Sequence, residues 1–437
     1  MHRKLAACLM AANIAATPAL AQAQGSDLEA LQRRIVELEA KNREIVAALA
    51  DLSVQVKAAQ AKAPEPGASK PSTDSPAPAA IVAEGNRSRL SFYGFVRVDA
   101  ILDDSRPNAA QTPTFIPSEN TAARNNDNFT LHPRLTRFGM NYAGPTLEPI
   151  GGARLSGKVE LDFQNGGSES RAVPRARQLY ARLDWQRSSL LLGQTADIIA
   201  PLFPSVNADT LMWNAGNLGD RRTQIRYSYT PGPLSFTAGL ALTGAVDQQD
   251  LDGNGIRDGE DSGVPHVQAR VGYKADGIEL GVWGHYANAE TTLPINGRKS
   301  FDSHSIGIDF LLQPSAVVSI KGELWTGEGL SDVRGGIGQS VNLTTGRSIE
   351  SSGGWFEVGL KASSIYSIAL GWTYDDPANQ DLPAGGRKLN RAWYLANQLR
   401  LGPALLLGLD YLRWRTDYLG LPQGTDNRFN LYGVYTF

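Results

Sequence analysis

Cysteine is almost missing from this chain, since its 437 residues contain only Cys8. Because Cys8 lies in an N-terminal stretch that we expect to be removed, the mature protein has no disulfide and no cysteine metal site. No apolar run is long enough for a transmembrane helix. Of the histidines, His132, His266, His285 and His304 are scattered without metal-ligand spacing. A formal net charge of −2 gives no sign of nucleic acid as a partner.

Motifs for catalysis are also lacking. The sequence has no Gly-x-Ser-x-Gly segment of the kind that carries a hydrolase nucleophile. Residues 152–159 nearly match a phosphate-binding P-loop, but Val159 stands where Ser or Thr should hold magnesium, and no helix is expected after it. We interpret this segment as a strand and do not expect an enzyme. A hydrolase whose serine and histidine meet only through folding stays an alternative.

The first 23 residues are typical of a secretory signal peptide. Arg3 and Lys4 provide the positive start, and residues 5–16 form the apolar core. Two small-x-small cleavage patterns end at residues 21 and 23. The sequence therefore predicts an exported protein.

Residues 24–60 are predicted to form an α-helical coiled coil. Apolar residues recur at alternating spacings of three and four, which is the a/d seam of a coiled coil. The seam residues are Leu28, Leu31, Ile35, Leu38, Asn42, Ile45, Leu49, Leu52 and Val56. A single helix lying on the rest of the protein is the alternative. Residues 61–88 are rich in proline, alanine and serine, and we interpret them as a linker without a core.

From residue 89 to residue 437 the pattern is strand after strand. Sixteen strands are expected, near 90–101, 132–143, 152–164, 175–186, 188–194, 220–230, 233–243, 264–275, 277–288, 301–312, 315–326, 354–363, 365–375, 388–400, 403–415 and 426–437. Long connections such as 195–219 alternate with short ones such as Gly402-Pro403. An antiparallel transmembrane barrel with tight periplasmic turns and long outer loops requires this alternation. The predicted fold class is an all-β transmembrane barrel of 16 antiparallel strands over 89–437, with the coiled coil in the periplasm.

The expected strands alternate apolar and polar residues. In the final strand the apolar face consists of Phe429, Leu431, Gly433, Tyr435 and Phe437. Because a closed barrel has no free edge, its last strand can run to a terminal aromatic residue. Soluble sandwiches show the same alternation. The signal peptide, the connection lengths and this final strand together favour a barrel in the bacterial outer membrane.

A barrel of this size encloses an aqueous channel, and something must narrow it. We expect residues 195–219, the long connection after the fifth strand, to fold into the lumen as a constriction. Its apolar run 198–203 would pack better inside the barrel than in water. An outer loop that points away from the lumen is the alternative.

The chain resembles the DcaP-like outer-membrane porins in its order of coil, linker and barrel and in several short motifs. These motifs are residues 92–100, 134–139, 193–194 and 221–227. The resemblance implies a homotrimer in outer-membrane lipid that passes small anionic solutes, for example dicarboxylates. Phosphate-selective porins share the barrel and part of this pattern, so phosphate stays an alternative substrate.

Alternation places a group of basic residues on the lumen walls beside the expected constriction, and two acidic residues within that loop. The pore-lining set is Arg97, Arg137, Lys158, Arg182, Arg222, Arg226, Asp197 and Asp209. A guanidinium offers a planar fork that suits a carboxylate, and rings of arginine or lysine are common in anion pores. The alternative is that these arginines pair with neighbouring carboxylates and only brace the wall.

Residues 250–261 follow the twelve-residue calcium-loop pattern. The predicted Ca²⁺ ligands are Asp250, Asp252, Asn254, Ile256 through its carbonyl, Asp258 and Asp261. Gly255 stands at the sixth position, where the loop turns sharply, but the last position has Asp261 in place of the usual glutamate. A merely acidic outer loop is the alternative. Apart from this possible ion, no cofactor is expected.

The predicted function is a water-filled diffusion channel for small hydrophilic solutes with a bias to organic anions. A second hypothesis is a structural tether whose coil spans the periplasm, although the sequence has no recognisable peptidoglycan-binding module.

Overall fold

The structure is a computed structural model that describes residues 88–437, except 123, 165–166, 169, 245–249 and 252–253. It also describes the backbone of residues 82–85, and Ala40. The expected signal peptide and almost all of the expected coiled coil and linker therefore lie outside the described residues. No helix among the described residues is long and apolar enough to cross a membrane.

Antiparallel strands close into one barrel with sixteen strand positions. Single strands occupy most positions, namely β2 (Ser88–Asp103), β5 (Ala153–Asp162), β8 (Arg175–Asp184), β9 (Ser188–Ala196), β10 (Arg221–Tyr229), β11 (Leu234–Ala241), β12 (His266–Ala275), β13 (Ile278–Ile295), β14 (Arg298–Leu312), β15 (Val318–Glu328), β18 (Glu350–Leu360), β19 (Tyr366–Pro377), β20 (Arg387–Leu401), β21 (Leu405–Tyr418) and β22 (Gly424–Thr436). Two pieces, β3 (Asn128–His132) and β4 (Arg137–Leu147), share the position next to β2. All sixteen strands expected from the sequence are present.

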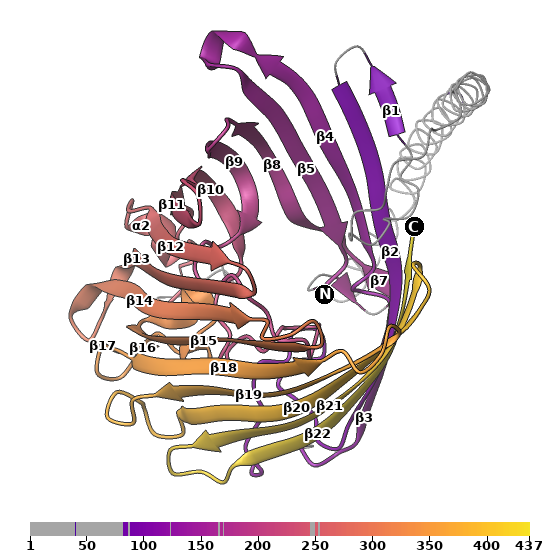
Figure 1. Cartoon of the computed structure of the whole chain (residues 1–437). Helices are drawn as coiled ribbons and strands as arrows, with labels where there is room; N and C mark the ends of the chain where they lie inside the picture. Colours follow the sequence, from indigo (N-terminus) through magenta and orange to yellow (C-terminus); the bar gives the residue numbers. More distant parts are fainter. Residues whose placement is uncertain are drawn as a thin grey trace, which may run out of the picture. The chain divides into compact units, whose positions relative to one another are not determined.

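The barrel closes between its first and last strands. Strand β2 pairs with β22 from Phe95 opposite Thr436 to Asp103 opposite Arg428. In Figure 1 the indigo β2 lies beside the yellow strands of the C-terminal end. A short strand, β1 (Val82–Gly85), pairs with the start of β2, where β22 has already ended. The last strand thus has a partner on both sides, as the sequence predicted.

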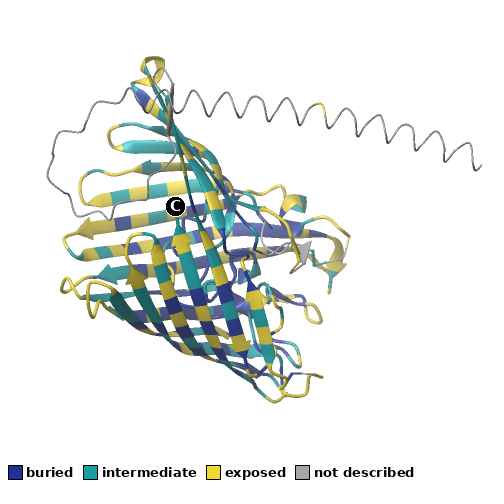
Figure 2. Ribbon diagram, turned by 90° about the vertical axis from the view of Figure 1, so that its right-hand side faces the viewer, coloured by how far each residue is buried: buried dark blue, intermediate teal, exposed yellow. Residues whose placement is uncertain are grey.

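Alternating burial distinguishes the two faces of the wall, and Figure 2 shows it as blue and yellow blocks along each strand. In β14, Ser305 and Asp309 face inward and are buried, whereas Ile306 is 60% exposed on the outer face. Apolar residues that face outward are stable only where water is replaced by lipid or by a partner. The pattern therefore indicates a lipid-facing outer surface and a polar interior.

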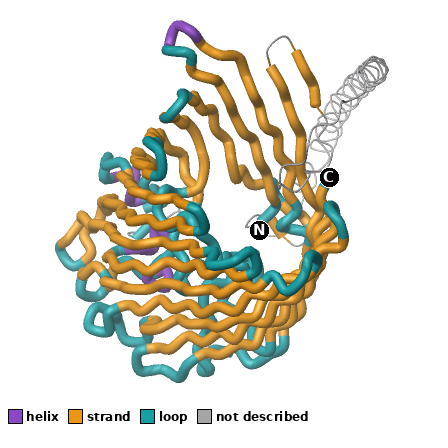
Figure 3. The backbone as a smooth tube through the Cα atoms, viewed as in Figure 1, coloured by secondary structure: helices purple, strands orange, loops and turns teal. Residues whose placement is uncertain are grey.

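Short connections and long connections alternate around the barrel. Strands make up nearly all of the wall, and helices occur only as short segments in the connections (Figure 3). The small elements are η1 (Glu148–Ile150), β6 (Gly167–Ser168), β7 (Arg171–Ala172), α2 (Asp258–Asp261), η2 (Leu330–Val333), η3 (Gly336–Gly338), β16 (Val341–Asn342) and β17 (Arg347–Ser348). Except for η1, all of them lie in long connections, so the long-loop end of the barrel is the elaborate end.

Candidate functional site

The connection from β9 to β10, residues 197–220, folds into the lumen, which confirms the expectation for 195–219. Its backbone N–H groups donate to side chains on the inner wall. The pairs are Ile198 with Gln268 of β12 at 2.6 Å, Leu202 with Glu323 of β15 at 2.8 Å, and Ser205 with Glu357 of β18 at 2.7 Å. We call this segment the constriction loop. Three separate strands hold it across the interior.

A buried ion network fixes the end of the constriction loop. Arg222 donates to Asp197 at 2.8 Å and to Asp332, on the β15–β18 connection, at 2.9 Å. The Arg222 side chain is 0% exposed. Burial acts to raise the pKa of Asp332, but the charges of Arg222 and His266 outweigh it and hold that pKa well below its usual range. Asp332 therefore stays ionised, and Arg222 binds the two connections to β10.

Two further connections also fold inward, which the sequence did not predict. They are residues 104–127, between β2 and β3, and 329–349, between β15 and β18. Their contacts include Ile116 N with Thr416 of β21 at 2.9 Å, Gly219 N with Val333 O at 2.8 Å, and Ile337 N with Asp375 of β19 at 3.1 Å. Among the described residues, three connections therefore pack inside the lumen.

Apolar side chains pack these connections against the inner wall. One cluster joins Ile116, Val206, Met212 and Ala215 of the connections to Ala369, Ala392, Tyr394, Ala396, Leu412 and Trp414 of β19–β21. A second joins Ile199, Ala200, Leu218, Leu330 and Val333 to Trp283 and Trp325. Burial of one large apolar side chain contributes about 1.5–3 kcal/mol. Packing on this scale holds the connections in place as a plug over part of the lumen.

The plug packs against β13, β15 and β19–β21 and leaves the lumen open mainly along β4, β5 and β8. Inward side chains of β13–β21 such as Trp283, Tyr394 and Trp414 are 0–2% exposed. On β4, β5 and β8, by contrast, the inward side chains of Arg137, Lys158 and Arg182 are 26%, 29% and 43% exposed. Water therefore reaches the inner side of β4, β5 and β8.

Arginines and carboxylates cover this open wall. Arg175 of β8 donates two hydrogen bonds to Asp162 of β5, at 2.9 and 2.8 Å. Arg177 bridges Asp162, at 2.6 Å, and Glu160, at 3.0 Å. Two guanidinium groups therefore share two carboxylates, and each guanidinium keeps donors that these contacts do not use.

The same wall continues onto β4 and β10 with more positive than negative charge. Arg137 lies 3.5 Å from Glu160, and Arg221 lies 3.7 Å from Asp220. Arg221 is within electrostatic range of Arg177 and Arg175. Burial acts to raise the pKa of Asp220, yet the charges of Arg334 and Arg221 outweigh it and lower that pKa. We call the set Arg137, Arg175, Arg177, Arg221 and Lys158, with Glu160, Asp162 and Asp220, the basic wall.

A β-bulge explains why the sequence missed part of the basic wall. Glu160 is opposite Gln178, but the next residue of β5, Leu161, is opposite Ala176, so Arg177 is an extra residue in β8. Strict alternation would send Arg175 and Arg177 to the lipid. The extra residue shifts the alternation by one position, and both side chains turn inward. Arg221 was missed because it is the first residue of β10 and borders the constriction loop.

The predicted pore-lining residues fall into two groups. Arg137, Lys158 and Arg182 lie on the open wall, together with Arg97 and Arg226 at its margins. Lys158 lies 3.9 Å from Glu160, Arg182 lies 2.7 Å from Asp184, and Arg97 lies 2.7 Å from Asp99. Arg226 donates to the Ala196 carbonyl and, at 3.0 Å, to Gln224. Arg222 of β10 is buried, as are Asp197 and Asp209 of the constriction loop, and their contacts hold the loop to the wall.

Asp209 anchors the middle of the constriction loop. Its carboxylate lies 3.4 Å from His132 of β3 and 3.9 Å from Arg428 of β22. Burial acts to raise its pKa, but His132 and Arg428 outweigh burial and lower it. Asp209 therefore carries its charge inside the plug.

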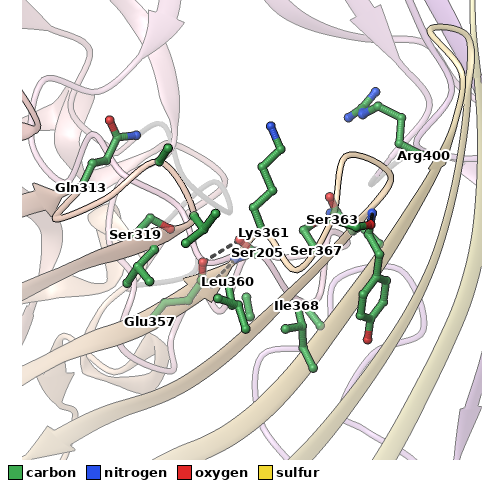
Figure 4. A pocket seen from close by; sticks show the side chains of 18 of the residues that line it. Ser205, Gln313, Ser319, Glu357, Leu360, Lys361, Ser363, Ser367, Ile368 and Arg400 are labelled. Atoms are coloured by element: carbon green, nitrogen blue, oxygen red, sulfur yellow. Dashed lines mark hydrogen bonds between the residues drawn. The ribbon is translucent and has the colours of Figure 1, made fainter.

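A cavity of about 560 Å³ opens at the short-turn end of β15, β18, β19 and β20. On its floor Glu357 binds Ser205 of the constriction loop and lies 3.2 Å from Lys321. Figure 4 shows the side chains of Lys361 and Arg400 extending away from Glu357 on the same side. No ion pair involves either of them among the described residues. The cavity adds further positive charge below the constriction.

The expected calcium loop is described except for Asp252 and Gly253. Asp250 accepts from the N–H groups of Asn254, at 3.1 Å, and Gly255, at 2.8 Å. Gly255 has φ +83°, and α2 begins at Asp258. Among the described residues no three His, Cys, Asp or Glu side chains are grouped closely enough to hold a metal. Calcium binding stays a prediction.

Comparison with known proteins identifies the fold only. No family model and no curated protein matches the sequence. A crystal structure of the outer-membrane channel DcaP of Acinetobacter baumannii is similar, with a TM-score of 0.66 and 16% identity over 80% of this chain and 98% of that one.

Two other solved structures match less closely. In-vitro folded OmpT of Vibrio cholerae in its trimer form matches with a TM-score of 0.53 and 12% identity, over 80% of this chain and 100% of that one. An anion-selective porin from Comamonas acidovorans matches with a TM-score of 0.52 and 13% identity, over the same shares.

Proposed function

We propose that this chain, which has the fold of the porins, forms an outer-membrane diffusion channel with a modest preference for small carboxylated anions. The observation that carries the proposal is the basic wall. It lines the part of the lumen that the plug leaves open, and its arginines and lysine outnumber its carboxylates. Solutes that pass the constriction loop must pass along this wall.

The chemistry of the wall suits transport better than tight binding. Rings of positive side chains favour anions, and conduction needs several weak sites in series. Each arginine of the basic wall already contacts a carboxylate of the protein. A passing anion therefore competes with that carboxylate for the N–H donors of the guanidinium group. Arg177 and Arg221 each present a planar fork that fits a carboxylate with two hydrogen bonds. Lys361 and Arg400 extend the positive path beyond the constriction.

The lipid-facing outer surface supports a location in the outer membrane, with the short turns in the periplasm. A homotrimer is the assembly that we propose, since a similar solved barrel is described as a trimer. The coiled coil predicted for 24–60 would then lie in the periplasm.

Reversal potentials in planar bilayers under a KCl gradient test the proposal. Wild-type protein is expected to favour chloride over potassium by a few-fold. In Arg177→Gln/Arg221→Gln we expect the reversal potential to shift toward cation preference, because two positive charges leave the open wall. Succinate added on one side should reduce potassium chloride current in the wild type and less in this variant.

Arg187→Gln/Arg347→Gln is the matched control, since both arginines are exposed and lie outside the basic wall. This control should keep the wild-type reversal potential. Cation preference in the wild type, or equal shifts in both variants, would contradict the role of the basic wall. Stronger block by phosphate than by succinate would favour the phosphate-selective alternative. Absence of any conductance would favour the tether.

A further inference from the structure

Three adjacent strands show the same order of residue types on their outer face toward the long-loop end. On β21 the outward residues run Leu409, Tyr411, Arg413, Arg415. On β20 they run Leu395, Trp393, Arg391, and on β22 they run Leu431, Phe429, Asn427. Each series passes from aliphatic to aromatic to polar. In a membrane barrel the aromatic girdle marks the interface, so the arginines stand at headgroup level.

Aromatic contacts confirm that the girdle is continuous across these strands. The rings of Trp393 and Tyr411 lie 5.5 Å apart, and those of Tyr411 and Phe429 lie 4.9 Å apart. The Tyr411 hydroxyl donates to Asn427 at 2.9 Å, and Arg413 donates to the same oxygen at 3.0 Å. The girdle and the polar row above it are therefore joined by hydrogen bonds.

The arginines face one another without enough negative charge. Arg391 is directly opposite Arg415 on the neighbouring strand. Like charges in this position destabilise a sheet unless an anion separates them. Asp417 lies 2.7 Å from Arg415 but 3.9 Å from Arg391, and the two guanidinium side chains remain 40% and 42% exposed. One carboxylate cannot use the ten N–H donors of two guanidinium groups.

Arg413 adds a third positive charge to the outer face. Its guanidinium lies within electrostatic range of the Asp104 carboxylate. That carboxylate already accepts a hydrogen bond from the Asn427 N–H at 2.8 Å. Three arginines, Arg391, Arg413 and Arg415, therefore share two carboxylates. Asp376, on the outer face of β19, forms no ion pair with any of them among the described residues.

We infer that Arg391, Arg413 and Arg415 form a binding site for the phosphate of an outer-leaflet glycolipid. A phosphate accepts several charge-assisted hydrogen bonds, and a guanidinium fork matches its geometry. A lipid phosphate fits better than a free one because the aromatic and aliphatic residues directly below the arginines accommodate acyl chains. The inference rests on the proposed location in the outer membrane, with the long loops outside.

Lipid A, a bis-phosphorylated glucosamine lipid, is the probe. Full-length protein in mild detergent would be titrated with it, and bound lipid would be counted by native mass spectrometry. Wild-type protein should retain lipid A, and Arg391→Gln/Arg415→Gln should bind it at least about ten-fold more weakly. Arg187→Gln/Arg347→Gln, which removes two exposed arginines elsewhere, should bind as the wild type does.

Further measurements distinguish a lipid phosphate site from a free phosphate site and from a contact between copies of the chain. Dephosphorylated lipid A should bind weakly to every variant, and inorganic phosphate at the same concentration should not displace lipid A from the wild type. Unchanged lipid binding in Arg391→Gln/Arg415→Gln, or equal binding of the dephosphorylated lipid, would overturn the inference. Loss of subunits from the assembly of this variant would overturn it too, because the patch would then be a contact between copies.

Conductance measured in a phospholipid bilayer separates the test of the lipid site from the test of the proposed channel. Arg391→Gln/Arg415→Gln should conduct with the wild-type reversal potential, because its substitutions lie outside the lumen. A wild type that binds lipid A and does not conduct would refute the proposed channel and leave the lipid site standing.

Discussion

Two neighbouring arginines in β10 have different environments and different roles. Arg222 is 0% exposed and bridges Asp197 and Asp332, whereas the Arg221 side chain is 10% exposed and has one ion pair, with Asp220 at 3.7 Å. The difference comes from their positions, since Arg221 is the first residue of β10 and lies beside Asp220 and Trp213 of the constriction loop, whereas Arg222 reaches Asp197 and Asp332. Their partners, more than their residue type, decide whether they hold the loop or face the solute.

Arg222→Leu should release the constriction loop. The substitution leaves Asp197 and Asp332 buried without their shared partner, and removal of one member of a buried pair costs about 3–5 kcal/mol. We expect larger single-channel conductance and chymotrypsin cleavage after Trp213, which is 3% exposed in the docked loop, in a barrel that is still folded. Arg221→Leu is the control and should change selectivity while the loop stays resistant. Wild-type conductance and protease resistance in Arg222→Leu would refute the anchoring role.

The anchoring carboxylates also predict a pH dependence. The pKa values of Asp209, Asp220 and Asp332 are lowered in the folded protein. A carboxyl group with a lowered pKa stabilises the fold above its unfolded value, about 3.9, and loses that contribution only as the pH falls through the folded value. The loop should therefore stay docked from pH 7 to about pH 4. A step in conductance between pH 7 and pH 5 would contradict this expectation.

At the scale of elements, connections and irregularities give the barrel its specific interior. The wall repeats one pattern, but the bulge at Arg177 adds two arginines to the lumen. Three connections then cover the opposite side. The open part of the lumen therefore lies on one side of the barrel, although all sixteen strand positions pair with their neighbours in the same antiparallel way.

The 250–261 connection is the element for which we predict calcium binding. With a dissociation constant of about 0.1–1 mM, typical of extracellular modules, Ca²⁺ should protect the connection from proteases. Asp250→Ala/Asn254→Ala should remove that protection, because both side chains supply predicted ligands. Glu260→Gln, which lies outside the predicted ligand set, should keep it. Equal cleavage with Ca²⁺ and with a chelator in the wild type would mean that the connection is only acidic.

At the scale of the whole molecule, we expect three barrels to associate. The heptads of 24–60 and the trimer form of a similar barrel motivate this prediction. Full-length protein in mild detergent should have the native mass of three chains. A variant that lacks residues 24–60 should dissociate at lower detergent concentration while its barrel stays folded. A native mass of one or two chains for the full-length protein would exclude the trimer.

The sequence by itself determined the wall of this protein. Alternation and turn residues are local, and they fixed sixteen strands, their order and the faces of residues such as Arg137 and Lys158. The entry of the constriction loop into the lumen followed from its apolar run 198–203. These features could be predicted because each depends on residues that are close in the chain.

Only the tertiary structure decided which side of the lumen is open and which charges face it. The plug depends on contacts between distant residues, for example Ile116 with Thr416 and Arg222 with Asp332. The inward turn of Arg175 and Arg177 depends on a bulge that forms against β5, and nothing in the local pattern of β8 marks it. Such features arise from pairing and packing across the closed barrel, where the environment of a side chain is set by strands far away in sequence.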